Sequence, residues 1–332
     1  MSTKGSPIAG CCPVCKSAET ELVACHVSEN LGFLGNRYCY IRCNRCSIIS
    51  QDPLPSWILL DDYYKKIDAR QQAKYSSDWG RSFLAKVKKH QQRQRTISLK
   101  QLIRYFATAG EQLYPYWGQL KPGPIVDLGA GSGGFCIEAG RRGFEVFGIE
   151  QSNSSVSLAS QMGVDLIQAD LAAPVARVLI AKASNVVMNH VFEHVLNPEQ
   201  FLLNLETTMK SGARLIIMIP NPFSIWRFVF GRRWYGWDPP VHVHHYSMKA
   251  LSDILGRTGF EVLKLRSVRR NDSLFAALNH AGFKQRFLIF PARILMIFVM
   301  PILASMGLGP ELVCIARVRR VSCCDDSSDL TT

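Results

Sequence analysis

Residues 124–150 constrain this chain more than any other stretch and read PIVDLGAGSGGFCIEAGRRGFEVFGIE. An apolar run containing Asp127 opens into closely spaced glycines, a segment of helical composition follows, and a second apolar run ends at Glu150. This order predicts a strand, a glycine loop, a helix and a second strand. Such a unit belongs to a parallel α/β sheet and places a ligand at the carboxyl ends of the strands.

The glycines alone leave the ligand ambiguous, because Gly129, Gly131 and Gly134 also fit the dinucleotide-binding pattern. Asp127 favours a different cofactor, since a carboxylate at the strand end repels a pyrophosphate but attracts the ammonium group of an amino acid. S-adenosyl-L-methionine (AdoMet) carries that ammonium, has no phosphate, and has ribose hydroxyls that Glu150 can hold. The stretch therefore predicts an AdoMet site, with a nicotinamide or flavin dinucleotide, or a glycine turn without a ligand, as alternatives.

Two Cys-x-x-Cys pairs near the start of the chain predict a metal site, and they are formed by Cys12, Cys15, Cys43 and Cys46. Two such turns present four thiolates to one ion, and a structural Zn²⁺ stabilises a module too small for its own core. We therefore expect a zinc ribbon over residues 1–55. Its remaining cysteines, which include Cys25 and Cys39, lie outside the pairs.

Composition limits the partners and the compartment. The 332 residues, 47% of them hydrophobic, suffice for one large core and a small accessory module. A formal charge of +13 indicates an anionic partner, either nucleic acid or an anionic membrane surface. Residues 1–9 are polar or small rather than signal-like, so we expect a cytoplasmic protein whose eleven cysteines are reduced instead of forming a disulfide framework.

Further apolar runs predict an α/β domain over residues 110–320. They end at Asp170, at Asn189 and at residue 219, and two more cover residues 259–268 and 311–320. Strands that alternate with helices predict a doubly wound, Rossmann-like sheet of seven strands whose last pair is an antiparallel hairpin. Asp170 at a strand end is placed to accept a hydrogen bond from the adenine amine, with an acid in a surface turn as the alternative. A linker and basic helix, 56–109, precede this domain, and a polar, disordered tail, 321–332, follows it.

A hydrophobic insertion, 270–310, separates the last two strands. Residues 287–306 are long enough to cross a bilayer, for which about 20 residues suffice, but they contain Pro291, Arg293 and Pro301. One crossing would place the last strand on the wrong side of the membrane from its sheet. We therefore expect residues 285–309 to form a re-entrant or interfacial hairpin at the inner face of the cytoplasmic membrane. A buried hairpin or an oligomer interface is the alternative.

The chain resembles the class I AdoMet-dependent methyltransferases of the type 11, 12 and 23 group. The resemblance covers residues 124–266 and the last strand, through the segments DLGAGSGG, GIEQS, QADL, NHVFEHVLNP, PNPFS, HVHHYS and GFEV. Proteins of this kind often have an amino-terminal zinc ribbon, and many belong to bacterial surface-glycan or lipid biosynthesis. The resemblance implies AdoMet contacts from Asp127, Gly129, Ala130, Gly131, Gly133, Glu150, Gln151, Asp170 and Asn189.

Methyl transfer requires little from the protein, because the sulfonium is already an activated electrophile. The protein must position the acceptor and remove a proton from an acceptor hydroxyl. His242 is the first candidate base and His190 the second; Glu193, His194, His244 and His245 complete the set. A structural hydrogen bond is the alternative for any single histidine. The segment HVFEH also resembles the metal-binding segment of ubiquinone-type O-methyltransferases, in which Glu193 and His194 match and His190 replaces an acid.

The most direct interpretation is an AdoMet-dependent O-methyltransferase that acts on a glycan, a lipid-linked sugar or a lipid intermediate at a membrane. The aromatic and basic residues of segment 223–238 predict a lid over the acceptor, with simple packing as the alternative. An rRNA or tRNA methyltransferase and a non-catalytic AdoMet-binding scaffold are the competing functions. The segment after the fourth strand lacks the Pro-Pro-aromatic pattern that grips a base amine.

Overall fold

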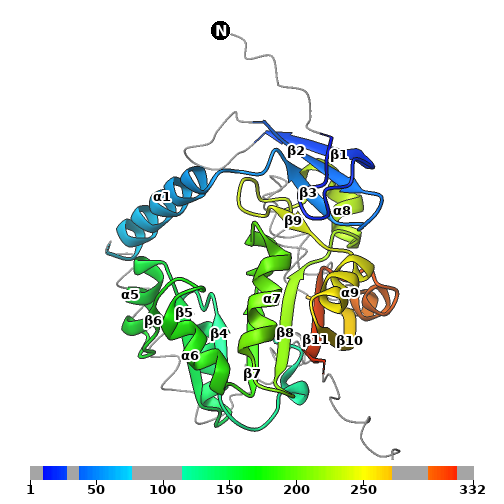
Figure 1. Cartoon of the computed structure of the whole chain (residues 1–332). Coiled ribbons are helices and arrows are strands. Elements are labelled where there is room, and N and C mark those ends of the chain that lie inside the picture. Colours follow the sequence, from blue (N-terminus) through cyan, green and yellow to red (C-terminus); the bar gives the residue numbers. More distant parts are fainter. Residues whose placement is uncertain (1–9, 28–36, 77–113, 271–297, 320–332) are drawn as a thin grey trace, which may run out of the picture.

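The computed structural model describes residues 10–27, 37–76, 114–270 and 298–319 (Figure 1). Three predicted features lie outside these ranges: the basic helix expected within residues 81–106, most of the hydrophobic insertion, and the tail.

The described residues contain a seven-stranded sheet in the order β10-β11-β8-β7-β4-β5-β6, which confirms the predicted Rossmann-like fold (Figure 1). The strands β4, β5, β6, β7 and β8 pair in parallel, while β11 is antiparallel to both β8 and β10. Every strand predicted for this domain is present. Their bounds are β4 Ile125–Leu128, β5 Val146–Glu150, β6 Ile167–Gln168, β7 Asn185–Asn189, β8 Arg214–Pro220, β10 Phe260–Val268 and β11 Glu311–Val318.

Both faces of this sheet are buried, because successive residues of a strand point to opposite faces. Val126 and Leu128 belong to one apolar cluster, and Ile125 belongs to another. The helices that follow the strands are α4 Gly134–Arg141, α5 Asn153–Gln161, α6 Pro174–Lys182, α7 Pro198–Thr208 and α9 Met248–Arg257. Ser152 and Ser247 cap α5 and α9 by accepting backbone N–H groups of the first turn.

A second sheet has the order β1-β2-β3-β9. Its strands are β1 Thr20–Val27, β2 Arg37–Cys43, β3 Ile49–Asp52 and β9 His244–His245. The fourth strand comes from the α/β domain, since Ser50 pairs with His244 and Ile49 with His245. The sheet of the amino-terminal module therefore holds in place one end of the histidine loop, residues 238–245.

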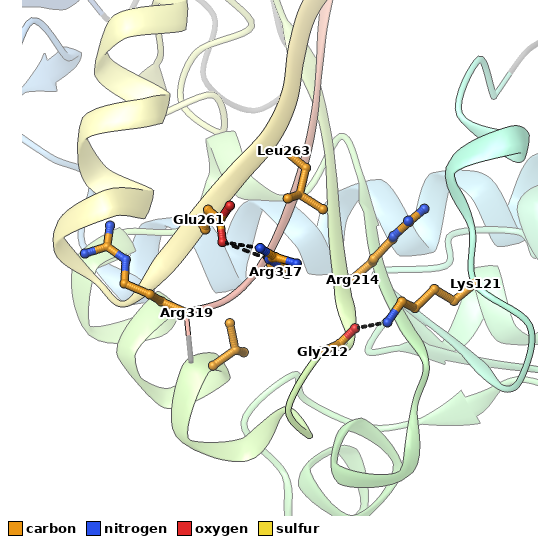
Figure 2. Close-up of a pocket in the computed structure, with 8 residues that line it drawn as sticks. Lys121, Gly212, Arg214, Glu261, Leu263, Arg317 and Arg319 are labelled. Carbon is orange, nitrogen blue, oxygen red and sulfur yellow. Dashed lines mark hydrogen bonds and ion pairs between the residues drawn. The ribbon is translucent and has the colours of Figure 1, made fainter. Parts of the chain in front are cut away.

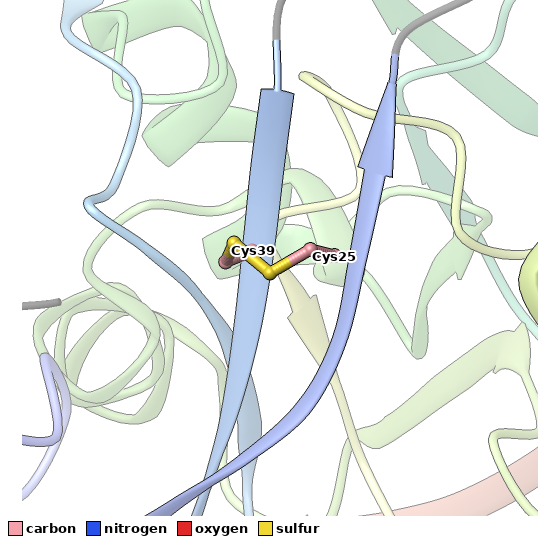
Figure 3. The surroundings of a disulfide bond; sticks show 2 residues. All are labelled: Cys25 and Cys39. Atoms are coloured by element: carbon pink, nitrogen blue, oxygen red, sulfur yellow. A yellow bond between two sulfur atoms is a disulfide. The ribbon is translucent and has the colours of Figure 1, made fainter. Parts of the chain in front are cut away.

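Cys25 and Cys39 form a disulfide between β1 and β2 (Figure 3). The expectation that these two thiols are reduced was wrong. Antiparallel pairing places the two residues opposite each other, with their Cα atoms 4.0 Å apart. Sequence alone does not reveal this register, so the two cysteines could be identified only as lying outside the Cys-x-x-Cys pairs.

Helix α1, Trp57–Ser76, replaces most of the predicted linker between the two modules. Leu60 and Tyr63 are buried against Leu196 and Val243. Further along the helix, the carboxylate of Asp68 accepts hydrogen bonds from the hydroxyls of Ser152 and Ser154, the latter at 2.6 Å. In Figure 1 the helix extends from the small sheet toward α5. It therefore connects the histidine loop with the start of α5, the helix that follows β5.

The described end of the insertion, 298–305, is helical and packs on the domain through Met300. The Asn221 side-chain amide fixes the turn after it by donating to the carbonyl oxygens of Gly307 and Gly309, at 2.8 and 2.7 Å. Within the described ranges, no helix combines the length and apolar character that crossing a membrane requires.

The aromatic segment after β8 forms α8 Ile225–Phe230 and a 3-10 turn, Gly231–Arg233. Trp226, Trp234 and Trp237 are buried in one cluster with Tyr40 and Met300. The packing interpretation therefore explains these three tryptophans. Phe228, in contrast, is 61% exposed and remains available to a ligand or a surface.

Candidate functional site

The glycine loop joins β4 to α4 in a conformation that needs its glycines. Gly129, Gly131 and Gly133 have φ angles of +71°, +55° and +78°, in the region that other residues rarely adopt. A Cβ atom at Gly129 would also lie 2.5 Å from Cγ2 of Val191. The loop is tied to the neighbouring strand, because the N–H groups of Gly129 and Ala130 donate to the carbonyl oxygen of Ile149 at 2.9 and 3.0 Å.

Two polar side chains at the ends of adjacent strands each have one buried atom without a hydrogen-bond partner among the described residues. Asp127 on β4 is 2% exposed, and its Oδ1 has no hydrogen-bond partner in the described part of the chain. Burial raises the pKa of this carboxyl to about 7. Asn189 on β7 accepts a hydrogen bond from the Tyr116 hydroxyl at 2.5 Å, but its Nδ2 has no partner among the same residues. Buried polar groups without partners indicate that a ligand completes the site.

The other predicted cofactor residues follow along the same edge. The carboxylate of Glu150 accepts backbone N–H groups of Gly131 and Ser152, both at 2.8 Å, so it lies against the glycine loop. Gln151 is exposed beside it. Asp170 is exposed just beyond β6 and accepts the N–H of Ala172 at 2.7 Å. The structure thus brings the predicted set together, at the ends of β4, β5, β6 and β7.

A second polar cluster lies beyond the end of β7, around Glu193 in the 3-10 turn Phe192–His194. The side chain of Glu193 is 1% exposed, and neither carboxylate oxygen has a hydrogen-bond partner in the described ranges. Nδ1 of His190 and Nε2 of His242 lie 3.4 and 3.9 Å from its Oε1. Burial would raise the pKa of Glu193, but His190, His194 and His242 hold it below its ordinary value.

His194 and His242 present nitrogen atoms to this carboxylate from two different loops. Nδ1 of His242 lies 2.8 Å from the carbonyl oxygen of Gly236. A carbonyl oxygen only accepts, so the tautomer of the neutral ring that fits this contact has its proton on Nδ1 and a lone pair on Nε2. Burial lowers the pKa of His194 to about 4, so this imidazole is neutral at neutral pH. One ligand atom from each of Glu193, His194 and His242 lies within 4.8 Å of the others, a set that suits a divalent cation.

His190 occupies a different environment from His242. Its φ angle is +55°, and its Nε2 lies 3.2 Å from Oε1 of Glu311, which also accepts a hydrogen bond from Arg270 at 2.5 Å. Burial alone would lower the pKa of His190, but Glu311 and Glu193 raise it to about 10. A protonated imidazole accepts no proton, so this environment disfavours His190 as a base.

The last two histidines of the predicted set belong to the packing of the domain. His244 is buried, with Nδ1 2.8 Å from the Ser50 hydroxyl and Nε2 3.2 Å from the carbonyl oxygen of Leu196. His245 is buried beside the rings of Tyr40 and Trp237. The structure therefore brings Glu193, His194 and His242 together and places His244 and His245 in the core.

Residues 83–265, more than half of the chain, match the profile of a family described as "Methyltransferase domain". The chain belongs to this family. It is an AdoMet-dependent methyltransferase.

Two curated relatives carry the name ubiquinone biosynthesis O-methyltransferase. The protein of Maricaulis maris (strain MCS10) is 31% identical over 157 residues, which cover 44% of this chain and 58% of the relative. The protein of Rickettsia canadensis (strain McKiel) is 27% identical over 170 residues, 48% of this chain and 71% of the relative. The match thus spans little more than half the length of the first relative.

Solved structures of similar shape include further methyltransferases. A SAM-dependent methyltransferase from Archaeoglobus fulgidus is 19% identical, with a TM-score of 0.39, over 66% of this chain and 91% of that chain. The geranyl diphosphate C-methyltransferase of Streptomyces coelicolor A3(2) is 16% identical, with a TM-score of 0.41, over 61% of this chain and 75% of that chain.

Two residues on α1 lie next to the site of this methyltransferase and were not predicted. The hydroxyl of Tyr64 lies 3.4 Å from Nδ1 of His194. Asp68 contacts the start of α5, one turn later on the same helix. The sequence did contain a signal, because Leu60, Tyr63, Tyr64 and Ile67 follow the spacing of an apolar helix face.

The four cysteines of the predicted zinc ribbon also come together. Sγ of Cys12 lies 3.7 Å from Sγ of Cys46, and Sγ of Cys15 lies 3.4 Å from Sγ of Cys43. All four sulfur atoms fall within 4.8 Å of one another. Tetrahedral Zn²⁺ with Zn–S bonds of about 2.3 Å requires S···S distances of about 3.8 Å. The arrangement fits structural zinc, which we propose for this site.

Replacing Cys43 with Ser is expected to abolish stoichiometric zinc binding and to lower the melting temperature by about 10 °C. Cys43 ends β2, and the site joins the turn before β1 to the turn between β2 and β3. Elemental analysis and thermal unfolding measure the two effects. Cys11→Ser is the matched control, because Cys11 is exposed and outside the cluster. Equal zinc content in the Cys43 variant and the wild type would contradict the assignment.

Proposed function

We propose that this methyltransferase transfers the methyl group of AdoMet to a hydroxyl oxygen of a lipid intermediate at a membrane surface. In this proposal Glu193, His194 and His242 hold a divalent cation. The observation that carries the proposal is the buried carboxylate of Glu193, whose oxygens lack hydrogen-bond partners among the described residues and face nitrogen atoms of His194 and His242. A carboxylate with two imidazoles is a typical divalent-cation ligand set.

Each residue of the cluster has a separate task in this mechanism. When bound, the cation lowers the pKa of an acceptor hydroxyl. His242 is held in the required tautomer by the carbonyl oxygen of Gly236, so its role changes from the predicted base to a ligand. The carboxylate of Glu193 would also accept the hydroxyl proton. Asp127 binds the ammonium group of AdoMet and so orients the methyl donor. The acceptor is positioned from the opposite side.

Helix α1 closes the space between donor and acceptor in this proposal. Tyr64 bonds to His194 at the acceptor side, and Asp68 bonds to Ser154 next to the cofactor edge. Exclusion of water by such a helix strengthens the attraction between charges at the reaction centre.

Exposed apolar side chains support a lipid acceptor. Phe228 and Val229 on α8 are exposed, as are Phe298, Ile302 and Met306 on the helix 298–305 and the turn after it. The two segments adjoin, because the N–H of Ile225 donates to the carbonyl oxygen of Leu308 at 3.0 Å. The relatives named for ubiquinone biosynthesis also favour a lipid over a glycan or a lipid-linked sugar, because ubiquinone is a lipid.

The decisive experiment is incubation of the protein with methyl-labelled AdoMet and fractionated cell extract, with Mg²⁺ or Mn²⁺ and, in parallel, with a chelator. We expect label in the lipid fraction, and less of it after chelation. Label confined to RNA or to glycan would contradict the lipid acceptor. Undiminished transfer after chelation would contradict the cation.

Replacing Phe298 and Ile302 together with Ser is expected to weaken binding to anionic lipid vesicles by at least about 10-fold, because burial of each side chain in lipid contributes about 1.5–3 kcal/mol. Both side chains are more than half exposed, so the fold is retained. Vesicle sedimentation measures the change. Val178→Ser on α6 is the control, since Val178 is exposed on another helix. Equal effects of both changes would rule out a specific membrane-facing surface.

A further inference from the structure

The histidine loop is held by backbone contacts from outside the α/β domain. Its last two residues form β9 on the sheet of the amino-terminal module. Just before them, the N–H of Gln51 on β3 donates to the carbonyl oxygen of Val243 at 2.9 Å. The N–H of Val243 in turn donates to the carbonyl oxygen of Glu193 at 3.0 Å. Hydrogen bonds thus connect the module through Val243 to the turn that carries Glu193.

The side chain of Tyr40 on β2 contacts the other end of the same loop. It is fully buried, and its hydroxyl oxygen lies 3.0 Å from the carbonyl oxygen of Trp237 and 3.2 Å from that of His242. Carbonyl oxygens only accept, so the hydroxyl donates and its single hydrogen is shared between them. Tyr40 therefore joins the two ends of the turn that leads to His242.

The two carbonyl oxygens lie next to the contact that orients the ring of His242. Nδ1 of this ring lies 2.8 Å from the carbonyl oxygen of Gly236, the residue before Trp237. Nε2 of the same ring lies 3.9 Å from Oε1 of Glu193. A shift of either end of the turn changes the contact with Gly236, and it therefore moves Nε2 with respect to Glu193.

Packing explains the ring of Tyr40 but not its hydroxyl. The ring lies beside those of Trp237 and His245, with centroid distances of 4.8 and 5.2 Å. A phenylalanine at this position would keep both ring contacts, because it lacks only the hydroxyl. The hydroxyl adds the hydrogen bonds to the two carbonyl oxygens, and this contribution can be removed without removing the ring.

We propose that Tyr40 is a positioning residue for methyl transfer, whose hydroxyl fixes the turn 237–242 so that Nε2 of His242 faces the carboxylate of Glu193. This role rests on the function proposed above, in which His242 and Glu193 bind a divalent cation. It makes the amino-terminal module a part of the methyl-transfer site rather than a separate unit. Hydrogen bonds that orient a metal ligand typically contribute about 10- to 100-fold to metal affinity or activity.

Tyr40→Phe tests this role in calorimetry with Mn²⁺ and in transfer assays with labelled AdoMet and the lipid fraction. We expect the Mn²⁺ affinity and the maximal transfer rate each to fall by about 10-fold, at the lower end of that range, because the hydrogen bonds reach the backbone and not the ring of His242. The KM for AdoMet and the zinc content are expected to stay within about 2-fold of wild type, since the glycine loop and the four cysteines are unchanged.

Hydrogen exchange gives a readout that needs no cation. The backbone N–H of His242 donates to the carbonyl oxygen of Asp238 at 3.1 Å, within the turn that Tyr40 joins. Loss of the tyrosine hydroxyl makes local opening of this turn easier. We expect the His242 amide of the metal-free protein to exchange about 5-fold faster in Tyr40→Phe than in the wild type, which corresponds to the loss of about one hydrogen bond.

Tyr38→Phe is the matched control. Tyr38 lies two residues earlier on the same strand and is buried, but its hydroxyl has no hydrogen-bond partner among the described residues. Lys121→Met controls for the loss of any side-chain donor. Nζ of Lys121 donates to the carbonyl oxygen of Gly212 at 2.6 Å, at the edge of the main sheet where β8 begins (Figure 2). Both variants are expected to keep the wild-type Mn²⁺ affinity and exchange rate.

The results separate this role from the proposed function. If Glu193→Gln loses Mn²⁺ while Tyr40→Phe and Tyr38→Phe bind it equally, the proposal is overturned. Parallel losses of AdoMet, zinc and Mn²⁺ in Tyr40→Phe would also overturn it, because Tyr40 would then stabilise the whole fold. If Glu193→Gln binds Mn²⁺ as the wild type does, or the wild type binds none, the cation site is wrong, and exchange of the His242 amide decides the role of Tyr40. An unchanged exchange rate overturns the role in every case.

Discussion

Replacing Asp127 with Asn is expected to weaken AdoMet binding by about 100-fold or more. The change keeps the shape of the side chain but removes the charge that attracts the ammonium group of AdoMet, and a hydrogen bond to a charged group contributes about 1.5–3 kcal/mol, the upper end of which is about 100-fold in affinity. Asn is also small enough for the buried position, which a bulkier cation such as Arg would disrupt. Calorimetry with AdoMet measures the loss.

The control for Asp127 is Asp165→Asn, an exposed acid that the glycine loop does not contact. This variant is expected to bind AdoMet as the wild type does. Thermal unfolding of the Asp127 variant without AdoMet should show a retained fold. If Asp127→Asn bound AdoMet with wild-type affinity, the carboxylate would not be the ammonium partner, and the main argument for the cofactor orientation would fail.

Asp127 should also give AdoMet binding a characteristic pH dependence. Burial raises the pKa of its carboxyl from 3.8 to about 7. The ammonium group binds the ionised form, so affinity rises as the pH increases through about 7, and Asp127→Asn abolishes this slope. The stability of the cofactor-free protein changes in the opposite direction. The raised pKa stabilises the fold below about pH 3.8, and that contribution is lost as the pH rises through about 7.

The main sheet was predictable because its signals are local. Parallel strands buried on both faces appear as continuous apolar runs, and the turn after β4 requires glycines at positive φ. The acids at the ends of β4, β5 and β6 could then be placed on one edge from topology alone. Long-range pairing explains what was missed. Strand β9 has two residues, His244 and His245, which is too short for a pattern in the sequence. They form a strand because they pair with β3, which lies far away in the chain.

The site was predictable as a set of residue types but not as a set of roles. His190 and His242 are both histidines, and both lie near Glu193. Their difference comes from Glu311 at His190 and from the Gly236 carbonyl oxygen at His242, contacts that folding alone creates. The same reasoning applies to α1, whose apolar spacing is visible in the sequence while the contact between Tyr64 and His194 is not.

Replacing Glu193 with Gln is expected to lower the rate of methyl transfer by about 1,000-fold and to abolish binding of Mg²⁺ or Mn²⁺. The amide has nearly the same shape, but it lacks the negative charge that a cation requires between His194 and His242. AdoMet affinity should remain near that of the wild type, because the carboxylate that accepts the N–H groups of Gly131 and Ser152 belongs to Glu150 and is unchanged in this variant. Calorimetry with each metal, and transfer assays with labelled AdoMet, separate the two effects.

His190→Gln distinguishes a cation site from a charge cluster that only stabilises the fold. His190 contacts Glu193 through Nδ1 at 3.4 Å but contributes no atom to the proposed ligand set. If the cation lies among Glu193, His194 and His242, this variant keeps its affinity for Mn²⁺ within a few-fold, whereas Glu193→Gln and His242→Ala lose it. Equal loss in all three variants would mean that the cluster acts as one structural unit. Methyl transfer by Glu193→Gln at the wild-type rate would remove both the cation and the proton acceptor from the mechanism.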